Sequence, residues 1–199
     1  MLRRVVQLVG ACLILGVGIG LLLLPALGSD GYSTLINGLR LYFDVPFALV
    51  NLLVGVVLVA MAWLRAVRPG LGTIVQPVVV GFTVSAVLAA VDPPSPMAWR
   101  IVLLVCALPL LAAGVALYLD SALGAGPTEA AALAWDPPVP FKWSYSVLQG
   151  TGAIAGWLLG AAIGPGTLVV IFLLGPMVDL MSRQLVSRRR DRQACGNPS

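Results

Sequence analysis

Residues 5–27 read VVQLVGACLILGVGIGLLLLPAL, a long run that contains no charged side chain. A helix needs about 20 apolar residues to cross a hydrocarbon core about 30 Å thick. Over the whole chain, 59% of the residues are hydrophobic and 10% are charged, whereas a soluble domain has about 25% charged residues. The run and the composition together predict an all-α membrane protein, because so few charges cannot cover a water-facing surface.

Further apolar runs of similar length follow, and we expect six transmembrane helices in one domain that covers residues 1–199. The expected spans are Val5–Leu27, Pro46–Leu64, Thr73–Val91, Ile101–Ser121, Val147–Ile163 and Thr167–Met181.

The cations are distributed unevenly over the two sides of such a protein. With six crossings, one side has ten cations and the other has only Arg40 and Arg100. The ten are Arg3, Arg4, Arg65, Arg68, Lys142, Arg183 and the tail residues Arg188, Arg189, Arg190 and Arg192. Because cytoplasmic loops carry the excess of Lys and Arg, we expect a multi-pass protein of the bacterial plasma membrane. Both termini, including the basic tail 183–199, are then cytoplasmic.

The first half of the chain recurs in the second. Residues 18–28 align with 114–124 with six of eleven positions identical, and both segments end in Ala-Leu-Gly. Residues 63–84 align with 157–178 with eight of twenty-two identical. The matches include Gly, Thr and Trp in the same order, whereas chance matches between apolar segments would favour Leu and Val. Duplication is therefore the better interpretation.

Each copy contains three crossings, repeat 1 over about 5–91 and repeat 2 over about 101–182. Because three is odd, the second copy enters the membrane from the opposite side. The sequence therefore predicts two inverted three-helix repeats, an architecture common among secondary transporters, whose sites lie between the repeats near interrupted helices.

Two short turns recur at matched positions, Gly70-Leu71-Gly72-Thr73 and Gly164-Pro165-Gly166-Thr167. In the structural interpretation, Thr73 and Thr167 cap the outgoing helices, and Thr73 forms a capping box with Gln76. In the functional interpretation, Gly72, Thr73, Gly166 and Thr167 dip into the bilayer and direct helix N-termini at an anionic or polar solute. The sequence leaves both interpretations open.

Three acidic residues are candidates for a solute pathway, since acids at membrane depth tend to mark ion or substrate paths. Asp120 ends the fourth expected span and lies either at the interface or in the interior. Glu129 is expected in the first turn of a short helix, where a carboxylate suits the helix dipole, and Asp30 in the equivalent place of repeat 1. Asp179 and Arg183, four residues apart, are expected to form an interfacial ion pair.

Glycines spaced by four predict close helix packing. The residues are Gly152, Gly156, Gly160 and Gly164 on the fifth expected helix, with Gly16 and Gly20 on the first. We expect this packing to be intramolecular, with a homo-oligomer through the glycine faces as the alternative. Pro77 and Pro176 are expected to kink their helices.

The sequence gives no support for an enzyme. It contains no His, its cysteines at Cys12, Cys106 and Cys195 lie far apart, and no carboxylates are paired at a working spacing. We therefore expect no catalytic residue, metal or cofactor, and no nucleic-acid partner. The expected partners are the lipid bilayer and a small solute or ion.

The Ala-Leu-Gly-x-Gly-Pro segment, the Pro-Gly-Leu-Gly-Thr turn and the closing Gly-Pro-Gly-Thr followed by Leu-Gly-Pro resemble the bacterial YczE/YitT-type membrane proteins. The resemblance covers nearly the whole chain. Where that family has a basic residue and Asp after the second Gly-Pro, this chain has Thr128 and Glu129, which keeps an acid and removes a cation. The resemblance implies a cell-membrane protein and carries no settled substrate.

Two functions remain. The first is a small-solute or ion transporter with its pathway between the inverted repeats. The alternative is a non-transporting membrane partner that scaffolds a biosynthetic or export complex through its glycine faces and basic tail.

Overall fold

A computed structural model describes residues 1–136 and 138–195. Within these residues all regular structure is helical, and there are eight helices in the order α1 to α8. Their bounds are α1 Leu2–Leu23, α2 Gly31–Phe43, α3 Phe47–Leu64, α4 Leu71–Ala90, α5 Met97–Ser121, α6 Pro127–Leu133, α7 Phe141–Leu158 and α8 Pro165–Cys195.

Five helices are long and apolar enough to cross a bilayer: α1, α3, α4, α5 and the part of α8 up to Gln184. They correspond to five of the six expected spans, and they indicate a membrane protein. The fifth expected span is displaced. We placed it at residues 147–163, whereas α7 begins at Phe141 and ends at Leu158, because Gly160 adopts a left-handed φ of +97° that ends the helix.

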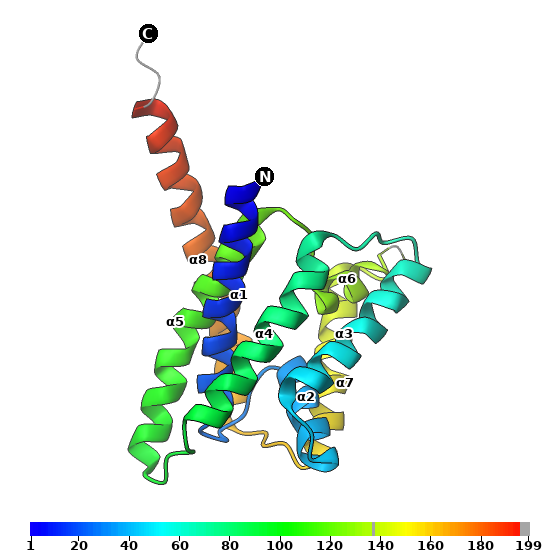
Figure 1. The fold of residues 1–199 in the computed structure, drawn as a ribbon, viewed down its shortest axis with the longest axis vertical. Coiled ribbons are helices and arrows are strands. Elements are labelled where there is room, and N and C mark those ends of the chain that lie inside the picture. Colours follow the sequence, from blue (N-terminus) through cyan, green and yellow to red (C-terminus); the bar gives the residue numbers. More distant parts are fainter. Residues whose placement is uncertain (137, 196–199) are drawn as a thin grey trace.

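The short helices α2 and α6 lie between the same two long helices. Each contacts both α3 and α7, and the contact of α2 with α7 is the more extensive. Among the remaining helices, α4 packs on α1, α1 on α5 and α5 on α8, and α4 also packs on α3. Figure 1 shows α2 and α6 at different heights, with α6 nearer the end of the molecule that carries the N-terminus and the end of α8.

Two glycines at matched positions bring α1 and α5 together. A Cβ added to Gly18 would lie 3.0 Å from the backbone nitrogen of Leu111, and one added to Gly114 would lie 2.8 Å from Cα of Leu15. Residue 15 of α1 thus lies beside residue 114 of α5, and residue 18 lies beside residue 111. Residue numbers rise along one helix as they fall along the other, so the two helices are antiparallel. The missing side chains permit the backbone-level contact that small residues provide in membrane bundles.

The glycine pattern on the fifth expected helix is partly confirmed as intramolecular packing. A Cβ on Gly156 would meet the backbone of Thr34 in α2, and one on Gly152 would meet the carbonyl of Gly31. On α1, Gly16 and Gly20 face Thr83 and Val87 of α4. The stripe does not continue along α7, however, since Gly160 and Gly164 lie beyond its end. The two expected internal prolines, Pro77 and Pro176, do lie inside helices.

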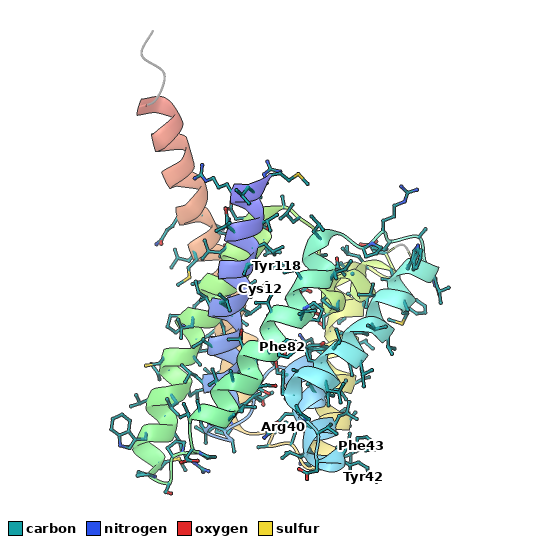
Figure 2. All side chains as sticks on the ribbon, in the orientation of Figure 1. Cys12, Arg40, Tyr42, Phe43, Phe82 and Tyr118 are labelled. Carbon is teal, nitrogen blue, oxygen red and sulfur yellow. The ribbon has the colours of Figure 1, made fainter. Side chains whose placement is uncertain are left out.

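Large apolar side chains cover the outside of the bundle, as expected where lipid is the solvent. Phe82 of α4 is 66% exposed and Trp63 of α3 is 68% exposed. Arg40, Tyr42 and Phe43 lie at the end of the molecule opposite Met1 (Figure 2). Trp99 and Trp143 are also exposed, whereas Tyr145 is half-buried and accepts a hydrogen bond from Gln149 of the same helix.

Candidate solute pathway

The turn before α8 packs against the turn that follows α1. We call residues 164–167 the α8 turn. The amide of Gly166 donates to the carbonyl of Leu27 at 2.8 Å, and Gly28, at a φ of +105°, lies against Gly164 and Thr167. A side chain at Gly28 would be strained by its backbone and blocked by the α8 turn. Glycine at these positions therefore serves a close crossing of two backbones.

The turn before α4 makes the matching contact with the turn that follows α5. We call residues 70–73 the α4 turn. The amide of Gly72 donates to the carbonyl of Leu123 at 2.9 Å, and Gly124, at a φ of +126°, lies against Gly70. Each of the two turns is thus completed by residues from the other half of the chain.

The expected capping roles of the threonines are wrong in position. Helix α4 begins at Leu71 with Gly70 as its N-cap, and α8 begins at Pro165, so both threonines lie inside the first turn. The hydroxyl of Thr73 accepts from the amide of Gly70 at 3.1 Å and donates to the carbonyl of Ala125 at 2.6 Å. Thr73 therefore ties the α4 turn to the opposite half of the chain.

The capping box that we expected with Gln76 is absent. Oε1 of Gln76 is buried and has no hydrogen-bond partner among the described residues. It lies beside Gly126, and Oε2 of Glu129 lies 2.5 Å from the point that a Gly126 Cβ would occupy. Gln76 thus faces the start of α6 rather than the start of its own helix.

A chain of polar side chains crosses the interior from α7 to α4. The amide of Tyr32 donates to Oε1 of Gln149 at 2.8 Å, and the Tyr32 hydroxyl donates to Oδ1 of Asn51 at 2.9 Å. Asn51 in turn donates from Nδ2 to the carbonyl of Pro77 at 2.7 Å, and Gln149 donates to the hydroxyl of Tyr145 at 2.8 Å. These bonds link α7, α2, α3 and α4.

The starts of the two short helices carry two half-buried carboxyls. Asp30 is the N-cap of α2 and accepts from the amide of Ser33 at 3.0 Å. We had expected it in the first turn of the helix, whereas it lies just before that turn. Glu129 lies in the first turn of α6, as predicted, and its Oε2 accepts from the hydroxyl of Thr128 at 2.9 Å. The two candidates come one from each half of the chain, and the charge of Asp30 acts on Glu129.

Burial raises the pKa of both carboxyls above their ordinary values. Desolvation is the main cause at Asp30, opposed by hydrogen bonds from Ser33. Desolvation is also the main cause at Glu129, and the nearby charge of Asp30 adds to it. Like charges near one another disfavour simultaneous ionisation, so at Glu129 the charge of Asp30 acts in the same direction as desolvation.

The other expected acids lie elsewhere. Oδ2 of Asp120 accepts from Nε2 of Gln7 at 2.7 Å, and this amide also donates to the carbonyl of Leu117, so Asp120 joins α5 to α1. Asp179 and Arg183 form the predicted ion pair at 2.8 Å. The side chains of Lys142 and of the tail arginines Arg188, Arg189, Arg190 and Arg192 lie outside the described residues.

Sequence reasoning did not single out Tyr32, Asn51 or Gln149. The clearest available indication was Asn51, a lone amide within the apolar run FALVNLLVG, because a polar side chain inside a span tends to find a partner across helices. Tyr32 and Gln149 had no such contrast, since both lie among other polar residues.

Comparison with known proteins identifies the family. The model of a family of unknown function, DUF6198, matches residues 2–183. The chain belongs to this family. An uncharacterized protein of Haemophilus influenzae is similar in sequence to this DUF6198 chain. The two are 28% identical over 170 residues, which cover 83% of this chain and 77% of the relative. No solved structure matches the DUF6198 chain.

Proposed function

We propose that this DUF6198 protein transports a small solute or ion along a pathway between two inverted halves, α1–α4 and α5–α8. The observation that carries the proposal is the pair of half-buried carboxyls, Asp30 and Glu129, at the starts of the two short helices. Carboxyls in the interior of a membrane protein are costly and tend to mark ion or substrate paths. Each half supplies one of them, as expected for a site between repeats.

Further polar side chains lie in the helices around these carboxyls. Tyr32, Asn51 and Gln149 bring hydrogen-bonding groups from three helices to the same region. Short helices that end inside the protein are the interrupted elements from which transporters build their sites.

The reciprocal contacts support the inverted repeat. Gly72 bonds Leu123, and the matched residue Gly166 bonds Leu27. Gly18 faces Leu111, and the matched residue Gly114 faces Leu15. Such reciprocity is what a two-fold relation between the halves requires. The proposal includes α7 as the sixth crossing, both termini on the cytoplasmic side of the bacterial plasma membrane, and kinship with the YczE/YitT-type proteins.

Flux into proteoliposomes tests the transport proposal. Vesicles that contain the purified protein and a trapped pH-sensitive dye report proton movement, and a panel of radiolabelled ions and small polar solutes reports the rest. We expect a flux above that of empty vesicles that falls at least tenfold in Glu129→Gln and Asp30→Asn. The control is Asp179→Asn, the same change of an acid to its amide at an exposed ion pair, which should keep the wild-type rate.

No flux for any member of the panel, with a folded protein in the vesicles, would overturn the proposal. The scaffold alternative predicts one stable partner that co-purifies, and a cellular activity that survives replacement of both carboxyls.

A further inference from the structure

The two crossing turns are fastened differently in this structure. At the α4 turn the hydroxyl of Thr73 donates to the carbonyl of Ala125, and the hydroxyl of Tyr118 donates to the carbonyl of Gly124 at 2.8 Å. The Thr73 bond supplements the shared backbone bond between Gly72 and Leu123. The Tyr118 bond lies within the segment that follows α5 and fixes the turn on which the α4 turn packs.

The α8 turn lacks both of these side-chain bonds. Leu22 stands where the matched position has Tyr118, so no hydroxyl is available there. Thr167 is 7% exposed, and its Oγ1 is buried with no hydrogen-bond partner among the described residues. By the alignment of the repeats, the acceptor that corresponds to Ala125 is the carbonyl of Ser29, which receives only a long bond of 3.4 Å from Thr34.

A crevice lies beside Gly28, in the segment on which the α8 turn packs. It has a volume of about 120 Å³ and is lined in part by Ala26, Gly28, Ser29, Asn37, Gly160 and Ala162. Because a buried hydroxyl without a partner is costly, a movement that brought the Thr167 hydroxyl to the carbonyl of Ser29 would stabilise the α8 turn.

The antiparallel contact of α1 and α5 provides a pivot between the turns. Gly18 precedes its turn by about ten residues, as does Gly114, which puts the contact roughly 15 Å from either turn along the helices. A rocking movement about this contact would bring one turn together as it separates the other.

We propose that Thr73 and Thr167 act as alternating latches, and that in this structure the Thr73 latch is fastened and the Thr167 latch is released. In the opposite state Thr167 donates to the carbonyl of Ser29, and Thr73 releases Ala125. The proposal rests on the proposed function, since it assigns the two turns as the gates of the same pathway.

Accessibility of matched cysteines tests the latches without any cargo. Ala26 and Ala122 occupy equivalent turns, share a φ of +52° and are both exposed. Single variants Ala26→Cys and Ala122→Cys, in a background where Cys12, Cys106 and Cys195 are replaced by Ala, are labelled with a membrane-impermeant maleimide. Sealed vesicles of both orientations are used.

We expect Thr73→Val to raise the labelling rate at position 122 several-fold and to lower it at position 26. Thr167→Val should do the reverse. The matched controls Thr73→Ser and Thr167→Ser retain the hydroxyl and should restore the original rates. If both valine variants move both probes in the same direction, or move neither, the latch proposal is wrong.

Two further outcomes separate the proposals. If Thr73→Val does not fold, Thr167→Val and its serine control still decide the question through the probe at position 26. Opposite shifts of the probes without any flux would contradict transport and keep the latches, whereas flux with unmoved probes would contradict the latches and keep transport.

Discussion

Helices α2 and α6 occupy comparable places between α3 and α7, yet different interactions hold them. Helix α2 has a side-chain cap from Asp30 and packs on α7 through glycines, with Gly31 and Gly38 facing Gln149 and Gly156. Helix α6 spans only Pro127–Leu133, and its N-cap, Gly126, provides no side-chain hydrogen bond. It buries Ala130, Ala131 and Ala132. Similar topology therefore does not require similar fastening, and the carboxyl at each start has a different local role.

The largest expected effect tests the feature that the two short helices share. Because burial raises the pKa of Asp30 and Glu129 from 3.8 and 4.5, the folded protein keeps protons that the unfolded chain has lost. The contribution of these carboxyls to the free energy of unfolding is then fully present below about pH 4. It is lost as the pH rises through the pKa values of the folded protein, by up to about 1.4 kcal/mol per pH unit for each carboxyl.

Thermal unfolding in detergent between pH 4 and pH 8 measures this dependence. We expect the wild-type melting temperature to fall with rising pH, and that of the double variant Asp30→Asn with Glu129→Gln to stay nearly level. The single variants show which short helix contributes more. A wild-type profile that rises over this range would contradict the assignment.

The next effect concerns the packing that is peculiar to α2. A Cβ at Gly156 would meet the backbone of Thr34 and Leu35, so Gly156→Ala should destabilise the protein by about 1–3 kcal/mol through overpacking. Gly150→Ala is the matched control in the same helix, since nothing lies within 4 Å of its added Cβ. Equal melting temperatures for the two variants would show that α2 and α7 are not in backbone contact.

The cap of α2 should contribute less. Asp30→Ala removes the acceptor of the Ser33 amide bond and should cost about 1 kcal/mol, whereas Asp30→Asn retains an effective cap and should cost less. Comparing Asp30→Ala with Asp30→Asn, which are both uncharged, separates capping from charge. A smaller loss for alanine than for asparagine would argue against the cap.

The smallest effect concerns the link from α2 to α3. Tyr32→Phe removes the bond to Oδ1 of Asn51, and the loss should be about 0.5–1 kcal/mol, because Asn51 keeps its bond to Pro77. Tyr42→Phe, at a tyrosine that is 66% exposed, is the control. Identical unfolding of the two variants would remove Tyr32 from the polar chain.

Much of the fold could be predicted because apolar length alone identifies a span. Helices α1, α3, α4 and α5 lie within a few residues of their expected bounds. Helix α2 was missed as an element of its own because 13 residues are too few to cross a bilayer, so nothing in its length marks it as buried. Helix α6 was expected as a short helix around Glu129, but we did not expect it to be buried.

The candidate site could be predicted in part for a similar reason. The repeat identified Gly72, Thr73, Gly166 and Thr167 as a matched set, and the structure gives the two turns matching partners. Local sequence could not supply those partners, because Leu123 and Leu27 are distant in the chain and look like any other leucine. Thr73 was expected to cap its own helix, since capping rules consider only neighbouring residues.

The bond from Gly166 to Leu27 has a consequence for biosynthesis. During translation the carbonyl of Leu27 enters the membrane long before its partner exists, because about 140 residues must still be added, which takes roughly 7–30 s at ribosomal speed. Until then the carbonyl of Leu27, just after α1, lacks this hydrogen-bond donor, and water, lipid headgroups or an insertion factor must satisfy it. A ribosome stalled before Gly166 would therefore leave a fragment that quality-control proteases can recognise.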